Sequence, residues 1–442
     1  MPKRKNSLSP LSRRDFLKYS IAAGAITPFA LSMSRANALE TNAHIVIVGA
    51  GAGGTAMANR LRRKLPNAKL TIIDAREEHY YQPGWTLVAS GLWNTKQVVT
   101  STQEWLPNGV NWVKGMVMEY NPDSNQLTLN NGDTLQYDYL IVASGLQLHY
   151  ERVAGMDANL IGQGHGIGSV YASPAAAEGT NKEIQRWLNK GSGRGLFNLP
   201  STPIKCAGAP LKMTFTTLDR LEKTGKREQY GVEFMAPTGR LFSVDYYHDF
   251  VARRFAKQGV VKNDHWLLTG IDHSAKKAYY DVNGEQRTKE YEFIHVVPPM
   301  SGGDAMANSP LAFQPGETYA GWLKVNRETL QNPDYPNVFG IGDVMGMPIN
   351  KTAASVKLQA AVLEHNFLAH LKGEALTAKH NGYTSCPLIT AIGKAMLVEF
   401  GWDGKLLPSF PFIDPKKESW AVWVMKEEML QPAYYAMLHG KA

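Results

Sequence analysis

The chain has two cysteines, Cys206 and Cys386, which lie far apart in the sequence. Cys206 directly precedes a helix predicted from Leu211 to Leu221, and Lys205 and Lys212 flank it. A helix N-terminus and nearby ammonium groups lower the pKa of a thiol and stabilise its thiolate. The pair could therefore be a redox-active disulfide. A structural disulfide that closes a long loop and two unrelated buried thiols are the alternatives.

Other reactive side chains are less informative. His165, His248 and His295 are candidates for a general base, but a lone histidine is more often a core or surface residue. Two cysteines exclude a zinc ribbon and a disulfide-rich scaffold. We therefore expect no metal site, and no general base is assigned.

The elements that must position the cysteines begin with a nucleotide-binding pattern. A buried strand over residues 44–48 leads into Gly49, Gly51 and Gly54, a helix follows, and the next strand ends at Asp74. In this pattern Gly49 allows a tight turn and Gly51 lets a pyrophosphate approach the backbone. Gly54 lets the helix pack closely on the strand. The acidic side chain can bind ribose hydroxyls. The sequence therefore predicts a dinucleotide site.

Two further segments favour FAD over NAD as this dinucleotide. A strand and turn ending at Gly145 is typical of the return to the first domain in two-domain flavoproteins. A second flavin signature over residues 337–343 contains Gly342 and Asp343, with Asp343 placed to bind the ribityl chain. Lys351 then opens a helix whose N-terminus would face the flavin pyrimidine edge and stabilise its reduced anion.

A nicotinamide site is not expected. Residues 191–195 are glycine-rich, but they precede the predicted strand over 196–199 and so lie at the wrong end of it for phosphate. The following strand, over 232–235, ends in Ala-Pro-Thr at 236–238 and offers no acid for a ribose. Electrons must therefore enter by another route, which makes the redox-active reading of the two cysteines the favoured one.

The positive charge of the chain is concentrated at its N-terminus. Residues 1–38 hold seven basic side chains and one acidic side chain. The remaining residues hold 40 basic and 38 acidic side chains. Arg13 and Arg14 form a twin-arginine signature, followed by a mild apolar stretch over 21–33 and a small-residue cleavage site over 36–38. We expect export to the periplasmic side of a bacterial inner membrane, and we exclude nucleic acid as a partner.

The C-terminal residues 400–442 have a different character, because eight of these 43 residues are aromatic. A short apolar helix is predicted over 420–425, capped by Ser419. Charged residues at 426–428 interrupt the apolar run, and a second short helix is predicted over 433–438. Aromatic and lysine residues around short apolar helices are typical of a monotopic membrane anchor. A core-packing or dimer-forming helix pair is the alternative, so a homo-oligomer stays open.

These segments predict an α/β fold with two Rossmann-like, glutathione-reductase-like domains and a C-terminal membrane-facing portion that handles quinone. The expected divisions are a twin-arginine signal peptide over 1–38, an FAD-binding domain over 43–154 plus 331–375, a second Rossmann-like domain over 155–330, and a C-terminal domain over 376–442.

The motifs around both cysteines resemble those of the sulfide:quinone oxidoreductases, most nearly the branch that includes the mitochondrial enzyme. The similarity runs from about residue 43 to the C-terminus. Some relatives have a third cysteine between the first two domains, and this chain has none near residues 168–170. The segments that carry the resemblance are 203–210, 382–388, 79–88 and 296–300.

The resemblance implies that hydrosulfide attacks a Cys206–Cys386 disulfide. Cys386 keeps the extra sulfur as a persulfide, Cys206 passes two electrons to FAD, and a sulfane-sulfur acceptor restores the disulfide. The electrons then leave to a quinone that Phe412 and Tyr434 sandwich beside the membrane surface. In related flavocytochrome c sulfide dehydrogenases a cysteine near residues 80–81 attaches FAD. Because this chain has no such cysteine, its FAD is expected to be non-covalent.

Three alternatives to this function remain at the level of sequence. The chain could be the flavin subunit of a sulfide dehydrogenase that passes electrons to a cytochrome c. A type II NADH dehydrogenase is disfavoured because the nicotinamide fingerprint is missing. A non-catalytic flavoprotein that carries persulfide to a partner belongs to a different class, and its mark would be FAD that no small reductant turns over.

Overall fold

The first parallel sheet is assembled from two separate stretches of the chain. The computed structural model, which describes residues 39–441, orders its strands β20-β9-β1-β2-β5, and every neighbouring pair is parallel. The strands are β1 (His44–Val48), β2 (Lys69–Ile73), β5 (Val110–Val113), β9 (Tyr139–Val142) and β20 (Val338–Gly340). Because β20 pairs with β9, the chain returns to this sheet after completing the second one.

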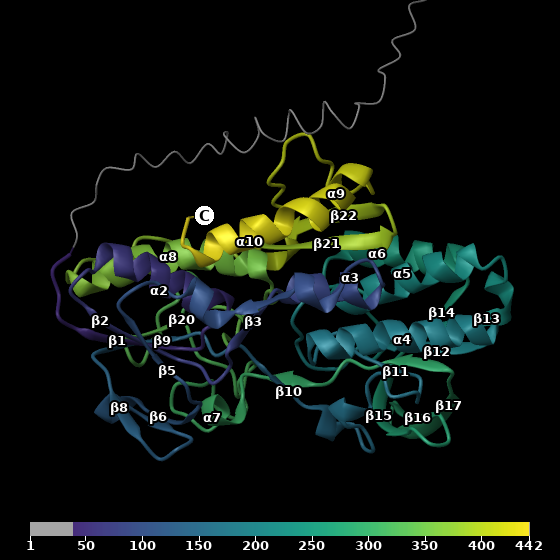
Figure 1. Ribbon diagram of the computed structural model, residues 1–442, viewed down its shortest axis with the longest axis horizontal. Coiled ribbons are helices and arrows are strands. Elements are labelled where there is room, and N and C mark those ends of the chain that lie inside the picture. The colour runs from purple at the N-terminus through teal and green to yellow at the C-terminus, as the bar shows by residue number, and fades with distance from the viewer. Residues whose placement is uncertain (1–38, 442) are drawn as a thin grey trace, which may run out of the picture. The chain divides into compact units, whose positions relative to one another are not determined.

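Helices α2 (Ala52–Lys64) and α8 (Ala353–Leu371) pack against each other beside this sheet (Figure 1). Strands β1 and β2 are almost continuously apolar and buried beyond their first residues. This pattern is typical of parallel strands that are covered on both faces.

The second sheet is also parallel, in the order β11-β18-β12-β13-β14. Its strands are β11 (Ile167–Gly168), β12 (Gly193–Asn198), β13 (Tyr230–Ala236), β14 (Val260–Asp264) and β18 (Phe293–His295). Its helices are α4 (Pro174–Lys190), α5 (Ala209–Lys223) and α6 (Asp245–Lys257), and α3 (Trp85–Ala89) packs on α4 and α5. The two α/β sheets establish the predicted fold class.

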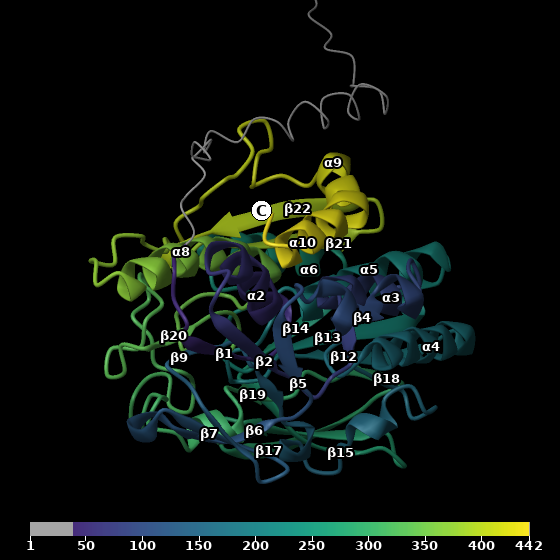
Figure 2. The same cartoon turned by 60° about the vertical axis from the view of Figure 1, so that its left-hand side comes forward.

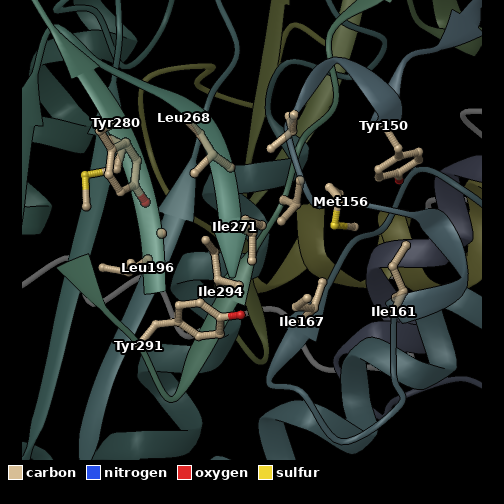
Figure 3. Packing of buried hydrophobic residues seen from close by; sticks show 14 of the residues in the cluster. Tyr150, Met156, Ile161, Ile167, Leu196, Leu268, Ile271, Tyr280, Tyr291 and Ile294 are labelled. Atoms are coloured by element: carbon tan, nitrogen blue, oxygen red, sulfur yellow. The ribbon is translucent and has the colours of Figure 1, made fainter. Parts of the chain in front are cut away.

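An antiparallel sheet of β15 (Trp266–Asp272), β16 (Lys277–Val282) and β17 (Glu285–Glu290) packs on the second parallel sheet. Figure 3 shows Leu196 and Ile294 of the parallel sheet in one apolar cluster with Leu268 and Tyr280. The buried Tyr280 hydroxyl donates to Asn198 Oδ1 at 3.0 Å, so its polar end is satisfied inside this core.

Short elements connect the two parallel sheets and edge the first. They are the pair β10 (Gln147–Leu148) and β19 (Met300–Ser301), the pair β3 (Glu78–Tyr80) and β4 (Val99–Ser101), the sheet β6 (Val117–Asn121), β7 (Gln126–Leu129) and β8 (Thr134–Gln136), and helix α7 (Asp304–Ala307). Residues from Glu40 onward form one compact unit, so the predicted domain boundaries inside it stay a prediction.

The C-terminal segment forms a hairpin followed by a helical run. The hairpin is β21 (Thr384–Ala391) and β22 (Lys394–Phe400), and the run is α9 (Trp420–Val424), a π-helical turn (Met425–Met429) and α10 (Leu430–Leu438). Figures 1 and 2 show hairpin and helices above α2, and α10 contacts α2 directly. No helix within residues 39–441 is long and apolar enough to cross a membrane.

The predicted Ser419 cap is present, since its side chain accepts from the Val422 N–H at 3.1 Å. The predicted interruption at 426–428 is wrong, because the chain continues there as a π-helical turn. Pro432 has no N–H that could donate to the carbonyl four residues earlier in an α-helix. The π-helical turn just before it is wider than an α-helical turn and so tolerates the loss of this hydrogen bond.

The turn between β1 and α2 requires glycine at two positions. Gly49 has a φ of +100°, and a Cβ there would lie 2.4 Å from the Ala143 carbonyl oxygen. A Cβ at Gly54 would lie 1.8 Å from the Gly49 carbonyl oxygen. At Gly51, by contrast, a Cβ would meet no atom of the described chain within 4 Å, and no side chain there caps α2. The helix N-terminus is therefore left open for an anion.

We expect Gly54→Ala to lower the free energy of unfolding of the cofactor-free protein by about 2 kcal/mol or more, because the new methyl group must push backbone atoms apart. The matched control, Gly51→Ala, should change it by less than about 1 kcal/mol, since the added methyl group meets open space. Urea unfolding followed by circular dichroism measures both. Equal losses in the two variants would contradict this account of the turn.

Candidate active site

Cys206 lies in the loop between β12 and α5, at the place where a second dinucleotide fingerprint would bind phosphate. Its φ of +46° is uncommon for a residue with a side chain. Its N–H donates to the Lys351 carbonyl at 2.9 Å, and its own carbonyl accepts from the Ala209 N–H at 2.7 Å and the Tyr171 hydroxyl at 3.3 Å. These bonds hold the loop in its left-handed conformation and tie it to the segment that carries Lys351.

Cys386 lies on β21, opposite Val398 of β22, and β21 packs on α5. Its Sγ is 3.8 Å from the Sγ of Cys206, and both residues are free thiols. A Cβ at Gly208 would lie 2.9 Å from the Cys386 sulfur, so the glycine permits the approach. The fold thus brings the two cysteines into contact at a distance from which a small shift forms a disulfide.

Lys212 supplies a positive charge next to both thiols. It is buried on the first turn of α5, and its Nζ donates to Cys206 Sγ at 3.4 Å. The hydrogen bond with Cys386, together with the charge of Lys212, holds the pKa of Cys206 well below its ordinary value despite burial. The same hydrogen bond between the two sulfur atoms, together with burial, raises the pKa of Cys386. These shifts favour Cys206 over Cys386 as the thiolate of the reduced pair.

Lys205, the other flanking lysine, is directed away from the sulfur atoms. Its Nζ donates to Gln82 Oε1 at 2.8 Å and to the Tyr171 carbonyl at 3.4 Å, and it lies 5.3 Å from the centre of the Trp85 ring. Burial lowers the pKa of Lys205 to about 8. This lysine holds the Cys206 loop against the segment around Gln82.

Lys426 is buried. The composition of the C-terminal segment wrongly predicted it as one of the lysines at a membrane interface. It is 2% exposed, and its Nζ donates to the Pro83 carbonyl at 2.7 Å. Burial, followed by the charge of Lys212, lowers the pKa of Lys426 to about 7, while Cys206 and Cys386 oppose this shift. The π-helical turn thus buries a titratable ammonium group whose charge interacts with both cysteines.

The predicted flavin signature lines a pocket next to this centre. The pocket walls include Gly342, Asp343, Met345, Asn350, Lys351 and Thr352. Among the described residues, the buried Asn350 Nδ2 has no hydrogen-bond partner. Burial raises the pKa of Asp343, with the charges of Lys351 and Lys205 opposing it. An unpaired amide donor and a carboxylate facing one pocket fit the polar edge and hydroxyl groups of a flavin.

Lys351 and Gly342 shape the turn in this pocket. The Lys351 Nζ donates to the carbonyls of Asp343 and Met345, both at 2.7 Å, and lies 3.9 Å from the centre of the Trp322 ring. Gly342 has a φ of +84°. The ammonium group therefore fixes the backbone next to the Asp343 carboxylate. Its role in binding a flavin stays a proposal.

The other predicted dinucleotide residues form a continuous path from the β1–α2 turn. Asp74 accepts from the Ala50 N–H at 2.7 Å through one carboxylate oxygen and from the Arg76 N–H at 2.8 Å through the other. Each oxygen keeps a lone pair for a ribose hydroxyl. Gly145 has a φ of +78°, and its open side meets no atom of residues 39–441 within 4 Å.

The three candidate histidines lie elsewhere. His295 is fully buried, burial lowers its pKa to about 3, and neither ring nitrogen has a hydrogen-bond partner in the described chain. His165 packs on His273, and His248 accepts from the Leu241 N–H. No hydrogen bond or ring contact of the described chain joins these histidines to either cysteine, so they are core and surface residues.

The two predicted quinone residues have different surroundings. Phe412 is 69% exposed and packs on Phe410, whereas Tyr434 is buried and its ring lies 5.0 Å from that of Tyr81. Within residues 39–441 no ring contact joins Phe412 to Tyr434. The structure therefore does not bring this pair together directly, because Phe412 belongs to an exposed loop and Tyr434 to the inner face of α10.

Three residues at this centre were missed at the level of sequence: Tyr171, Gly208 and Lys426. Gly208 stands beside the cysteine motif, and its small size is a visible signal. Lys426 interrupts an apolar run, which also marks a buried charge, but the sequence does not show what surrounds it. Tyr171 reaches Cys206 only through tertiary packing, and no local pattern reveals it.

We expect Lys212→Met to raise the pKa of Cys206, because the thiolate loses its nearest cation. The rate of iodoacetamide labelling at Cys206, measured against pH in the reduced protein, reports this pKa. The matched control is Lys205→Met, which removes a neighbouring, partly buried lysine that donates elsewhere and should shift the profile less. Equal shifts in the two variants would refute the assignment of Lys212.

We expect the free energy of unfolding to rise between pH 7.5 and pH 9. The pKa of Lys426 is about 7 in the folded protein and 10.5 in an exposed lysine, so the unfolded chain binds more protons in this window. Each such group contributes at most about 1.4 kcal/mol per pH unit. Lys426→Met should reduce the slope measured by urea unfolding, and an unchanged slope would contradict the buried, shifted ammonium.

Comparison with known proteins places this centre in a family. A model of the pyridine nucleotide-disulphide oxidoreductase family matches residues 43–180. The mitochondrial sulfide:quinone oxidoreductase of Mus musculus is 37% identical over 397 residues, which cover 89% of this chain and 86% of that protein. Its namesake in Dictyostelium discoideum is 36% identical over 405 residues, which cover 91% and 87%.

A solved structure of the sulfide:quinone oxidoreductase from Aquifex aeolicus has a TM-score of 0.74 at 21% identity, covering 90% of this chain and 92% of the other, and so shares the fold. Both mitochondrial relatives share more than a third of their aligned residues with this chain over most of its length. The chain therefore belongs to the sulfide:quinone oxidoreductase family.

Proposed function

We propose that this protein oxidises sulfide with a bound, non-covalent FAD and passes the electrons to a quinone, with Cys206 and Cys386 as the sulfur-accepting pair. Membership of the family supports the overall reaction. The observation that carries the role of the cysteines is the 3.8 Å contact between their sulfur atoms beside the buried Lys212. A structural disulfide would need no buried cation beside it.

We propose the roles of the two cysteines in the first step from the family resemblance and from the contact between Lys212 and Cys206. Hydrosulfide attacks the Cys386 sulfur of the disulfide, a sulfur–sulfur bond forms there, and the bond to Cys206 breaks. Cys206 leaves with the electron pair as a thiolate, and Cys386 becomes a persulfide. A thiol with a lower pKa is the better leaving group, and Lys212 lowers that of Cys206. The sulfide sulfur is thereby oxidised by two electrons and the disulfide is reduced.

The cycle closes when a second hydrosulfide or another thiol removes the sulfane sulfur from Cys386. FAD, when bound, accepts the electron pair that is released as the disulfide forms again. The Cys206 N–H bond to the Lys351 carbonyl keeps the thiolate beside the pocket that would hold the flavin. Both cysteines of the chain belong to this pair, so none is left for a thioether to the cofactor.

Several features favour sulfide over a nicotinamide as the electron donor. The glycines at 191–195 precede or begin β12, and the loop at its other end carries Cys206 instead of a phosphate-binding turn. Strand β13 ends at Ala236 with no acid at its end for a ribose. Cys206 lies just before the N-terminus of α5, in the loop position that the dinucleotide turn occupies in the first domain.

We further propose a membrane surface as the place of quinone reduction. Phe412, Trp420 and Met429 are exposed by 69%, 41% and 38%, and Lys416 and Lys417 lie in the same loop as Phe412. Apolar and basic side chains together are typical of a monotopic contact. The twin-arginine leader supports a periplasmic location, but it lies outside the described residues. The relatives named above are mitochondrial, so export of this chain to the periplasm is our proposal.

The test is an anaerobic titration of the purified FAD-loaded protein with sulfide. We expect sulfide to bleach the flavin absorbance, and Cys206→Ser or Cys386→Ser to abolish the bleaching, because each removes one half of the disulfide. NADH should leave the spectrum unchanged. Bleaching by NADH without bleaching by sulfide would overturn the proposal.

The same preparation separates the remaining alternatives. Reoxidation of the bleached flavin by a water-soluble quinone supports the proposal. Reoxidation only by cytochrome c would indicate a sulfide dehydrogenase flavin subunit. FAD that neither sulfide nor NADH reduces would indicate a non-catalytic persulfide carrier.

A further inference from the structure

The segment over residues 296–300 carries part of the family resemblance, yet the proposed reaction gives it no role. It follows β18 and ends in β19, where Met300 is 1% exposed. The Met300 N–H donates to Thr202 Oγ1 at 3.0 Å, and the Met300 Sδ accepts from the Lys205 N–H at 3.4 Å. One buried methionine therefore bonds the chain at two points directly before Cys206.

The bond to the Lys205 N–H holds the residue next to the reactive cysteine. Within residues 39–441 the Met300 thioether is the hydrogen-bond partner of this N–H, and no other acceptor bonds it. A thioether is a weak acceptor, but a backbone N–H inside a protein that lacks any partner costs more. The next N–H along the chain, that of Cys206, donates to the Lys351 carbonyl at 2.9 Å. These two successive bonds fix the backbone that carries the Cys206 sulfur.

Strand β19 is itself fixed by its pairing with β10. The two strands are antiparallel, with Met300 opposite Leu148. The His149 N–H donates to the Pro299 carbonyl at 2.9 Å, and the Nε2 of its buried side chain lies 2.7 Å from the Ser301 hydroxyl. Met300 therefore stands on a short pair of strands with several bonds of its own, and it can act as a fixed support for the loop.

The β10–β19 pair also lies between the two parallel sheets (Figure 1). β10 begins two residues after Gly145, in the turn that follows β9 of the first sheet, and β19 follows β18 of the second sheet. Because Met300 stands where the chain crosses between the sheets, its bonds set the position of the Cys206 loop relative to both of them.

We propose that Met300 is a positioning residue that holds residues 202–205, so that Cys206 stays within reach of Cys386 and next to the predicted flavin pocket. No hydrogen bond of the described chain joins Met300 to either cysteine sulfur, so it acts only through the loop. The inference rests on the proposed function, because it concerns the placement of the proposed redox pair. It gives the 296–300 segment a role that the reaction steps do not.

Two equally buried methionines provide a test of the thioether. Met300→Leu removes the acceptor for the Lys205 N–H and keeps a similar volume. Met306→Leu makes the same change on α7, where the sulfur accepts no hydrogen bond within the described residues. We expect Met300→Leu to slow formation of the Cys206–Cys386 disulfide about three- to tenfold, because the displaced loop separates the two thiols. Met306→Leu should leave this rate unchanged.

The rate is measured on the reduced, FAD-loaded protein after anaerobic addition of oxidised glutathione. Samples are blocked with iodoacetamide at intervals, and mass spectrometry follows the linked pair of peptides. Urea unfolding of both variants reports any general loss of stability.

Thr202 provides a second, independent pair of variants. Thr202→Val removes the hydroxyl that accepts from the Met300 N–H, and Thr202→Ser keeps it. We expect Thr202→Val to slow disulfide formation and Thr202→Ser to restore most of the wild-type rate. The pH profile of iodoacetamide labelling at Cys206 should move to higher pH in Thr202→Val alone, since the displaced thiolate lies farther from Lys212.

The outcomes separate this inference from the function on which it rests. Equal rates in Met300→Leu and Met306→Leu, with equal rates in Thr202→Val and Thr202→Ser, would overturn the role of Met300. A loss of stability in Met300→Leu and Thr202→Val with no change in rate or labelling profile would also overturn it, because Met300 would then serve packing only. Failure of the wild-type chain to form the Cys206–Cys386 disulfide would instead overturn the proposed function.

Discussion

The contact between the Cys206 and Cys386 sulfur atoms depends on a cation that is buried with them. Lys212 lies buried on the first turn of α5, where its ammonium group loses most of its hydration energy and needs a nearby anion to offset that loss. The Cys206 thiolate supplies that anion at 3.4 Å. In the reduced protein the two groups stabilise each other's charge. Gly208 contributes by leaving room for the second sulfur.

This arrangement uses a nucleotide-binding architecture for sulfur chemistry. In the first domain the N-terminus of α2 is open and uncapped by any described side chain, as an anion site requires. In the second domain the equivalent helix, α5, begins behind Cys206. The same helix-terminus electrostatics can therefore serve a pyrophosphate in one domain and a thiolate in the other. The C-terminal segment completes the centre, because it supplies both Cys386 and Lys426.

Local features of this site could be predicted from the sequence, and the tertiary ones could not. The β1–α2 turn and Asp74 belong to one continuous motif, and the Ser419 cap depends on three residues. The burial of Lys426 depends on Pro83, and the environment of Tyr434 depends on His79 and Tyr81. These partners are hundreds of residues away in the sequence. The local pattern of the C-terminal segment therefore indicated only helices at a membrane surface. The discontinuous first sheet was predictable because its last strand carries its own flavin signature.

The central claim is that Cys206 and Cys386 form one redox pair. The most direct measurement is a peptide map of the intact protein under non-reducing conditions, before and after treatment with a thiol reductant. The account predicts a linked pair of peptides, one containing Cys206 and one containing Cys386, which separates on reduction and forms again on oxidation of the FAD-loaded protein. Cysteines that stay unlinked after oxidation, or that link only to another molecule, would contradict it.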